Sequence, residues 1–387
     1  MILFQFSKLP GHGLPRDRLK CMSSAYETRR AKLAQVLAHE GVAAYVAAGI
    51  ATLTYLHAMH ETGGERFLGV FLKADGSRAM VAPRLSATQA ERLGITDVRP
   101  WIDGEDPLAL VSALGSEWGL TEAKIAVDDD MPAHMVLGLQ QALPKATLVL
   151  GHELRAKVMA IKDSDELAAL HAAGAAADGA WDEVRPQIKA GLTEIAVAEM
   201  LQNAMKARGG KPLFSIIAAG AGAAEPHHGS DETVIKEGDV VICDFGCEVD
   251  GYVSDITRTV VVGEPTDEQK KVYDLVHRAH HAARAAIKPG VAFQDVDRAA
   301  RAVITEGGYG EYFIHRTGHG VGMNVHEAPN VVEGETRPLQ PGHCFSIEPG
   351  IYLPGRFGVR IENLVTVTEE GHASFNVDPA AELTSVG

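Results

Sequence analysis

The alternation of apolar and polar positions in the first third of the chain predicts a mixed α/β domain over residues 24–155. Apolar stretches at 42–48 and 67–72 have the length of buried strands, whereas the pattern at 26–40 repeats with the period of a helix. This region contains no concentrated catalytic motif. Before it, two prolines and two glycines disfavour regular structure, so residues 1–23 are predicted to form a tail.

A polar segment, KDSDE at 162–166, marks the start of a second domain. Ser164 is a suitable N-cap for the long Ala-rich helical pattern that follows, and Glu166 falls in its first turn. We therefore expect a linker at 156–163 and a second domain at 164–387.

The second domain repeats its own pattern of elements. The sequence IKAG at 188–191, followed by a helical pattern that ends at a Gly-Gly pair, is echoed by IKPG at 287–290 and a second such helix. Each half then continues with a strand and a hairpin, and the two hairpins are expected at 239–263 and 343–368. The matched order of elements favours an internal duplication, in which the two hairpins meet at a shared centre.

The composition is that of a globular protein without a polyanionic partner. Its 387 residues, 46% of them hydrophobic, are enough for two domains with substantial cores. A formal charge of −15 argues against nucleic acid or an anionic membrane, since both attract clustered Lys and Arg. There is no long apolar run, and the opening MILFQF is too short for a signal peptide, so we expect no membrane-spanning helix and a cytoplasmic location.

Four carboxylates and one imidazole in β-rich segments of the second domain are the candidate metal ligands: Asp244, Asp255, His319, Glu348 and Glu362. Each residue taken alone is better explained as a turn former or a solvated side chain. Together they would repel one another or protonate if buried, unless positive charge lies among them. Five oxygen and nitrogen donors without a thiolate suit two Mn²⁺ or Co²⁺ ions about 3.5–4 Å apart, with Zn²⁺ also compatible.

The first hairpin places two of these acids on one face under either of two turns. If the turn is centred between Val249 and Asp250, Asp244 and Asp255 lie directly opposite each other, with Cβ atoms ~5 Å apart. If Asp250 and Gly251 instead form a two-residue turn, the two acids are diagonal neighbours ~7 Å apart. In both registers the two like charges either clamp a cation or destabilise the hairpin.

From about residue 155 to 370 the chain resembles the pita-bread metallopeptidases, and most closely the Xaa-Pro branch of prolidase and aminopeptidase P. The resemblance is carried by the motifs CDFG, GYVSDITRT, HRTGHGVG, VHEAP, SIEPGIY and VRIEN. The preceding region is similar to the creatinase-like N-terminal domain that accompanies this branch. The resemblance implies an α/β (α+β) protein whose catalytic domain has a pita-bread fold with an internal pseudo-two-fold repeat.

The resemblance also assigns a task to each candidate ligand. Asp244 would be a terminal ligand of one ion, and His319 and Glu348 would hold the other. Asp255 and Glu362 would bridge both ions.

Further residues of the same motifs are expected around the ions. The resemblance implies that His227, in EPHHG, and His326 donate hydrogen bonds during the reaction, and it favours His227 over the neighbouring His228. His315 matches a family histidine that binds substrate or supports the site. Arg360 matches an arginine that supports the bridging carboxylate two residues later.

The activity implied by the resemblance is hydrolysis of Xaa-Pro bonds by a water shared between the two ions, with Glu348 accepting its proton. Such a bond needs a dedicated enzyme because proline lacks the N–H group and has a fixed φ. We expect an Xaa-Pro dipeptidase acting as a homodimer on proline-containing dipeptides. The alternatives are an Xaa-Pro aminopeptidase acting on oligopeptides and a non-catalytic binding module on the same fold.

Two other groups are better explained without a functional role. His277, His280 and His281 recur on one helix face with a spacing that suits metal ligands, but a solvated helix face is the more common reason for such a pattern. Arg337, just before PLQPG, could meet a substrate carboxylate, although a surface arginine is the simpler interpretation.

Overall fold

The computed structural model describes residues 16–387, which divide into two compact units at Val158 and Met159. Helix α1 (Arg16–His39) begins inside the segment that was predicted to be a tail, so that prediction was wrong for residues 16–23. No glycine or proline interrupts the chain over these positions, and Arg, Leu and Lys all favour helix. The rest of the predicted tail, residues 1–15, lies outside the described residues.

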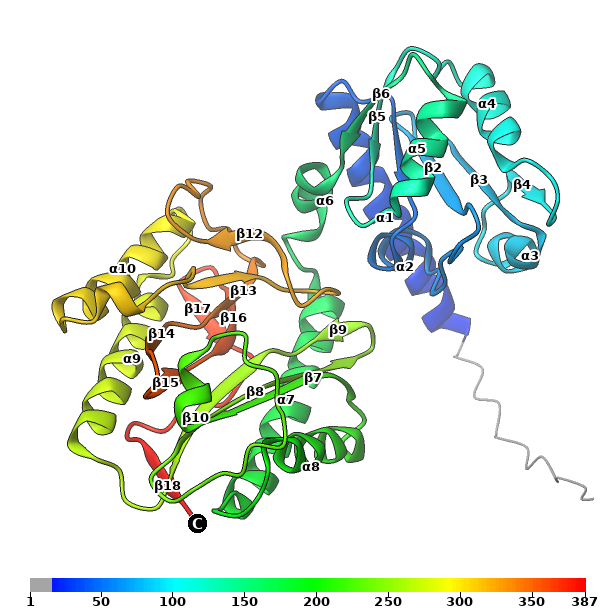
Figure 1. Cartoon of the computed structure of the whole chain (residues 1–387). Helices are drawn as coiled ribbons and strands as arrows, with labels where there is room; N and C mark the ends of the chain where they lie inside the picture. The colour runs from blue at the N-terminus through cyan, green and yellow to red at the C-terminus, as the bar shows by residue number, and fades with distance from the viewer. Residues whose placement is uncertain (1–15) are drawn as a thin grey trace, which may run out of the picture. The chain divides into compact units, whose positions relative to one another are not determined.

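The first unit is a six-stranded mixed sheet with helices (Figure 1). Its strands follow the order β4-β3-β2-β1-β5-β6 and comprise β1 (Ala44–Ala47), β2 (Gly69–Lys73), β3 (Arg78–Pro83), β4 (Val98–Trp101), β5 (Lys124–Val127) and β6 (Thr147–Leu150). The helices after α1 are α2 (Ile50–His57), α3 (Arg84–Arg92), α4 (Pro107–Glu117), α5 (Ala133–Ala142) and α6 (His152–Met159). Helix α6 thus occupies the first part of the expected linker.

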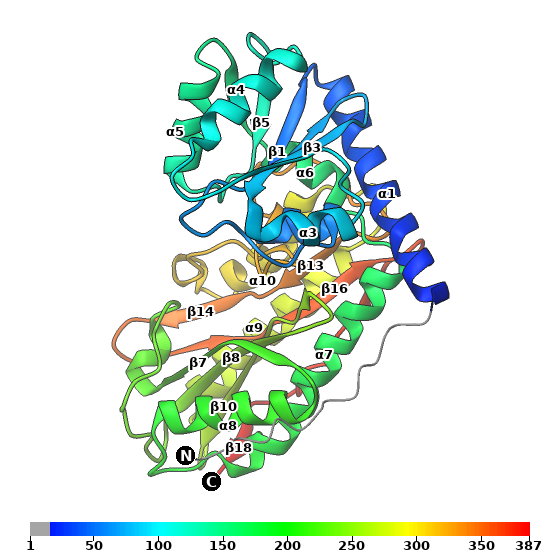
Figure 2. The ribbon, with the colours of Figure 1, turned by 90° about the vertical axis from the view of Figure 1, so that its right-hand side faces the viewer.

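Four long helices and two principal sheets form the second unit. The helices are α7 (Ser164–Val184), α8 (Glu194–Ala207), α9 (Asp267–Ala286) and α10 (Phe293–Glu306). Figures 1 and 2 show α7 and α8 on one side of the strands and α9 and α10 on the other. Each pair packs its own apolar core against the strands, so the two largest cores of the described part of this unit have the sheets between them.

The N-cap of α7 differs from the predicted one by one residue. Asp163, not Ser164, accepts hydrogen bonds from the N–H groups of Asp165 and Glu166. The Glu166 carboxylate in turn accepts the Asp163 N–H at 2.9 Å, which completes a reciprocal capping box. This pairing favours the residue three positions before a glutamate as the cap.

The strands of the second unit form one sheet for each half and a further two-stranded ribbon. The first sheet has the order β18-β10-β8-β7, with β9 paired to β8, and contains β7 (Lys211–Ala219), β8 (Val240–Val249), β9 (Tyr252–Val253), β10 (Ile256–Val262) and β18 (Thr384–Val386). The second has the order β12-β11-β13-β16-β17 and contains β11 (Gly318–Gly320), β12 (Glu327–Val331), β13 (Cys344–Ile347), β16 (Asn363–Val367) and β17 (His372–Ser374). The ribbon pairs β14 (Gly350–Leu353) with β15 (Phe357–Arg360).

The two halves repeat one another in backbone detail. Gly191 and Gly290 both have positive φ, 92° and 88°, just before α8 and α10 respectively. The Gly191 N–H donates to the carbonyl of Ile235, and the Gly290 N–H donates to that of Leu339. The glycines of the repeated IKxG motif therefore turn the chain in the same way in both halves, because a left-handed conformation favours glycine.

The register of the first hairpin is the second of the two predicted alternatives. Asp250 and Gly251 form the turn, with φ values of 51° and 82°, and this conformation matches the twist of the flanking strands. The pairing continues through β10 and sets Asp244 opposite Thr257. Asp244 and Asp255 are therefore diagonal neighbours on one face.

The second hairpin is interrupted at the two glutamates. Its inner and outer parts share one register, since Ile347 pairs with Asn363 and Gly350 pairs with Arg360. Glu348 and Glu362 fall in the gap between these parts. A single antiparallel bridge between Thr257 and Glu362 then joins the first hairpin to the second, so candidate ligands from both halves meet here.

None of the helices in the described part of the chain combines the length and the apolar character that a bilayer crossing requires.

Candidate metal centre

A cavity of about 710 Å³ lies in the second unit, and the candidate ligands line it. Asp244 comes from β8, Asp255 from the link between β9 and β10, and His319 from β11, while Glu348 and Glu362 occupy the interruption of the second hairpin. Four further residues singled out from the sequence line the same cavity: His227, His315, His326 and Arg360. The structure thus brings all nine side chains together.

The ligand atoms form two overlapping groups. Asp244, Asp255 and Glu362 each offer an oxygen, and these atoms lie within 4.8 Å of one another. His319, Glu348 and Glu362 form a second group by the same criterion. The His319 Nε2 atom lies 3.4 Å from a Glu348 oxygen and 3.6 Å from an Asp255 oxygen, which brings Asp255 close to both groups.

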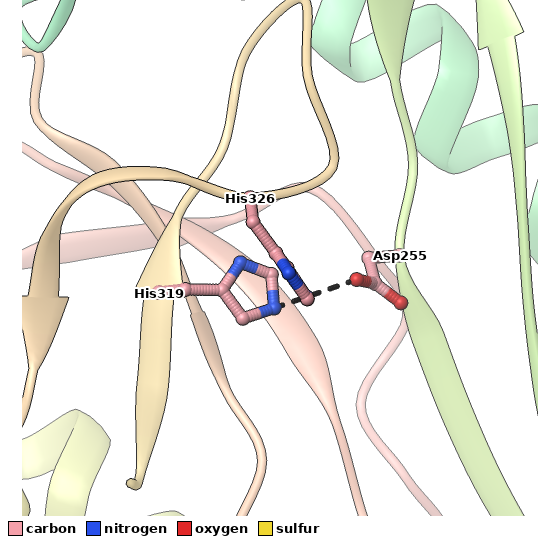
Figure 3. A group of neighbouring side chains, drawn as sticks. All are labelled: Asp255, His319 and His326. Atoms are coloured by element: carbon pink, nitrogen blue, oxygen red, sulfur yellow. Dashed lines mark ion pairs between the residues drawn. The ribbon is translucent and has the colours of Figure 1, made fainter. Parts of the chain in front are cut away.

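Figure 3 shows His319 and His326 on neighbouring segments, with Asp255 approaching from the first hairpin. The two imidazole rings meet edge to face, with their centroids 4.1 Å apart. The Nδ1 atom of His319 lies 3.1 Å from the Gly320 carbonyl, which can only accept a hydrogen bond. This contact favours a proton on Nδ1 and leaves the Nε2 lone pair directed at the carboxylates, as a metal ligand requires.

Glycine makes the close packing around His319 possible. A Cβ atom on Gly318 would overlap the backbone carbonyl oxygen of Ser346 on the adjacent β13. The backbone of β11 therefore approaches β13 more closely than any other residue type would permit.

Asp255, Glu348 and Glu362 hold protons more tightly than isolated carboxylates would. Burial, together with the charges of Glu362, Asp244 and Glu348, raises the pKa of Asp255 well above its usual value. Burial and the charges of Glu348 and Asp244 do the same to the pKa of Glu362. Burial is also the main reason that the pKa of Glu348 rises to about 7 and that of His319 falls to about 3. The cluster has too little positive charge to balance its four carboxylates.

Arg360 neutralises only part of this cluster. Its guanidinium donates to Asp244 Oδ2 at 2.6 Å, to the Tyr352 hydroxyl at 2.9 Å and to the Thr257 hydroxyl at 3.2 Å. Asp244 Oδ1 and Glu362 Oε1 are buried with no hydrogen-bond partner among the described residues. Buried orphan oxygens of this kind are rare, and divalent cations fit them.

The contact between Arg360 and Glu362 is indirect: Arg360 donates to Thr257, and its charge lowers the pKa of Glu362 against the larger effect of burial. Thr257, not Arg360, binds the Glu362 carboxylate, through its hydroxyl at 2.7 Å. The bridge between Thr257 and Glu362 sets these two side chains against each other, whereas the longer Arg360 side chain reaches across to Asp244. Thr257 belongs to the GYVSDITRT motif, but only the pairing between the hairpins reveals its contact.

The histidines differ in how they are held. His315 uses both ring nitrogens, with Nδ1 2.7 Å from the Arg316 carbonyl and Nε2 2.9 Å from the Tyr352 hydroxyl. His227 lines the cavity, whereas His228 turns away to the Glu194 carboxylate at 2.8 Å. Tyr352 also lines the cavity and was missed in the sequence, although it lies within the SIEPGIY motif.

Two groups outside the cavity follow the simpler interpretations only in part. Arg337 binds its near neighbour Glu335 at 2.8 Å and does not line the cavity. His277 and His281 contact each other at 3.2 Å on α9. His280, however, is fully buried, so the interpretation of all three as a solvated face is wrong for this residue. The helical period carries it to the apolar side of α9, which faces the core.

Comparison with known proteins agrees with the fold. Residues 168–369 match metallopeptidase family M24, and residues 29–158 match the creatinase/prolidase N-terminal domain. The probable dipeptidase PepE of Mycobacterium tuberculosis is 41% identical over 364 residues, which cover 92% of this chain and 96% of that protein. The Xaa-Pro dipeptidase of Lactobacillus helveticus is 35% identical over 330 residues, covering 84% and 90%.

A solved structure shows the same architecture over almost the whole chain. Recombinant prolidase from Thermococcus sibiricus superposes with a TM-score of 0.88 at 34% identity, covering 93% of this chain and 99% of the other. The protein is a metallopeptidase with a pita-bread catalytic domain. More closely, the chain belongs to metallopeptidase family M24, in the Xaa-Pro dipeptidase branch, with a creatinase/prolidase N-terminal domain.

Removing metal should make the stability of the protein depend on pH. Between about pH 4.5 and 7 the folded metal-free protein binds more protons at Glu348 than the unfolded chain does, because its folded pKa is raised to about 7. The free energy of unfolding should therefore fall as pH rises through this window. Calorimetry between pH 5 and 8, with chelator or with Mn²⁺, measures this effect.

In the same experiment, metal-free Asp255→Asn should lose less stability with pH than the metal-free wild type, since it lacks one repelling charge. A metal-free wild type that gains stability from pH 5 to 8 would contradict the repulsion described here.

Substituting Gly318 should distort the centre. Gly318→Ala forces β11 away from Ser346, so we expect weaker metal binding and a lower melting temperature. Gly371→Ala is the matched control, because its Cβ would meet only one atom at an ordinary 3.7 Å. Equal metal affinity in both variants, measured by titration calorimetry, would refute the packing argument.

Proposed function

We propose that the protein is an Xaa-Pro dipeptidase with a dinuclear metal centre. The observation that carries this proposal is the pair of overlapping ligand groups, which share Glu362 and have Asp255 close to both. The names of the relatives, Xaa-Pro dipeptidase and prolidase, support the substrate class.

One ion would be held by Asp244, Asp255 and Glu362, and the other by His319, Glu348, Asp255 and Glu362. The mainly carboxylate donor set favours Mn²⁺ or Co²⁺, with Zn²⁺ also compatible. When bound, two such ions polarise the scissile carbonyl and make a water acidic enough to ionise near neutral pH.

The side chains around the ions supply the proton transfers and hydrogen bonds. Glu348 lines the cavity and would accept a proton from the attacking water, and its pKa of about 7 without metal supports this role. His227 and His326 line the cavity from two different loops and are suited to donate hydrogen bonds to the developing oxyanion or the leaving group. Tyr352 joins His315 to Arg360 through hydrogen bonds of 2.9 Å on each side, which holds these three cavity-lining side chains relative to one another.

Arg316 favours a dipeptide over a longer peptide. It lines the cavity and, unlike Arg360, forms no hydrogen bond or ion pair through its guanidinium with the described residues. A dipeptide carries a free carboxylate one residue beyond the scissile bond, and an unpaired guanidinium is the group that binds a carboxylate best. Arg316 was not singled out in the sequence, although it follows His315 in the HRTGHGVG motif.

Two alternatives remain distinct from this proposal. An Xaa-Pro aminopeptidase would use the same metal centre but would require space beyond the proline for a continuing chain. A non-catalytic binding module would not need the complete ligand set seen here, and the intact carboxylates argue against it.

Arg316 should discriminate between substrates with and without a terminal charge. Arg316→Ala is expected to raise KM for an Ala-Pro dipeptide about 10- to 100-fold, the effect of one charge-assisted hydrogen bond, and to change little for Ala-Pro amide. Steady-state kinetics on both substrates measures the difference. Wild-type cleavage of Ala-Pro-Ala as fast as Ala-Pro would instead identify an aminopeptidase.

Asp255→Asn should nearly abolish activity. The amide removes negative charge beside both ion positions, and we expect kcat to fall at least about 100-fold, more than the loss of a supporting contact around a metal. Asp250→Asn in the nearby turn is the matched control and should keep its activity, because Asn also tolerates the positive φ of 51°. Turnover by Asp255→Asn close to that of wild type would contradict a dinuclear centre.

A further inference from the structure

A buried carboxylate in the first half fixes the loop that carries His227. Glu194, the first residue of α8, is fully buried. Its Oε1 accepts the N–H of Ala219, at the end of β7, at 2.8 Å. Its Oε2 accepts the N–H of Asp231 at 3.1 Å and lies 2.8 Å from His228 Nε2. One side chain therefore ties the edge of the sheet to two points of the loop.

Two further contacts hold the same loop in place. The Ser230 hydroxyl accepts the N–H of Ile217 at 2.7 Å, and the His228 ring lies so close to Gly222 that a Cβ there would be 3.2 Å from it. His227 itself forms no hydrogen bond within the described chain, so its direction depends on the loop. The next residue in the chain, His228, makes the contact with Glu194.

The group formed by Glu194, His228 and Asp231 also has the spacing of a metal site, with ligand atoms within 4.8 Å of one another. However, both Glu194 oxygens already face hydrogen-bond donors, and Asp231 uses its own carboxylate to accept the Thr233 N–H at 2.6 Å. This is the pattern of a satisfied clamp, unlike that of the candidate metal centre, where buried oxygens have no partner.

In the second half, a buried carboxylate holds the segment around His315 in a similar way. Asp297 of α10 is 1% exposed, and its Oδ1 accepts the Thr317 hydroxyl at 2.6 Å and the Thr317 N–H at 3.1 Å. The same carboxylate pairs with Arg301 at 3.0 Å. Arg301 in turn donates to the carbonyls of Phe313 at 2.9 Å and His315 at 2.8 Å, so the whole segment 313–317 is fixed to α10.

We propose that Glu194 and Asp297 are positioning residues, one in each half of the second unit, which hold His227 and His315 in place for the reaction. The proposal rests on the proposed function, since it requires His227 to act on the peptide and His315 to support the site through Tyr352. The acids occupy different positions, the first residue of α8 and the second turn of α10, so the halves share the device without sharing the residue.

Isosteric removal of either charge should loosen one loop and leave the other intact. Glu194→Gln and Asp297→Asn keep the side-chain volume but weaken the contacts to His228 and Arg301. A displacement of a reacting group by about 1 Å can cost on the order of 100-fold in rate. We therefore expect each variant to lower kcat about tenfold with little change in KM, at wild-type metal content.

Crossed double-mutant cycles separate positioning from general stability. The loss caused by Glu194→Gln should shrink to less than about twofold in a His227→Ala background and persist in a His315→Ala background. Asp297→Asn should show the reverse pattern. The exposed acids Glu199 and Asp295 lie on the same two helices, and their amide variants are the controls that should retain wild-type kcat.

Several outcomes would overturn the proposal. If the loss of kcat caused by each buried-acid variant is the same in both histidine backgrounds, the acids stabilise the fold and do not position one particular histidine. If Glu194→Gln removes one equivalent of bound metal, the first group is a metal site and not a clamp. Should Glu194→Gln not fold, His228→Gln and His228→Ala test the same contact, and rescue by Gln, which keeps a donor, is the expected result.

The single histidine variants keep this proposal separate from the proposed function. Slow His227→Ala and His315→Ala enzymes without the crossed coupling would refute positioning only. Histidine variants with wild-type kcat would refute the catalytic role of those residues, and the positioning proposal with it.

Discussion

The mutual repulsion of four carboxylates in one cavity is the constraint on which the second unit depends. Asp244, Asp255, Glu348 and Glu362 lie together, and Arg360 forms an ion pair with one of them, Asp244. A fold that gathers acids in this way is stable only with added positive charge or bound protons. The unit therefore stores unfavourable electrostatic energy that metal binding releases, and the sheets and helices around the cavity must be stable enough to bear it.

The duplication explains how the chain builds such a cavity. Each half contributes a hairpin whose outer residues pack on its own pair of helices. In the first hairpin β8 is unbroken and only its partner strand is interrupted, at Ser254 and Asp255, so the hairpin offers its acids from one face. The second is interrupted, which frees the backbone around Glu348 and Glu362 from ladder pairing. Two similar halves thus present different ligands, and the centre is asymmetric although the scaffold is nearly symmetric.

The sequence predicts the scaffold and singles out the candidate ligands that the structure gathers in one cavity, because both follow from local patterns. Hydrophobic periodicity predicts the elements, and acids inside β-rich segments are conspicuous. The residues that it does not reveal act across elements. The role of Thr257 depends on the bridge between the hairpins, and that of Tyr352 on its contacts with His315 and Arg360. The role proposed for Arg316 depends on its guanidinium having no partner among the described residues. These relations exist only once the halves are assembled.

Local patterns also fail where burial depends on a neighbouring element. The polar face expected on α9 includes His280, which the core encloses because the helix packs against strands far away in the sequence. The start of α1 differs for another reason. Residues 16–23 contain no helix breaker, yet their proximity to prolines and glycines suggested a tail.

The single backbone bridge between Thr257 and Glu362 links the two halves of the second unit beside the candidate metal centre. The first hairpin meets the second at this bridge, and candidate ligands from both halves lie around it. A small sliding of one half against the other would therefore widen or narrow the space for the ions. The preference for one cation radius over another then depends on how the whole of each half packs against the other. Substitutions in the distant helix cores would therefore change it.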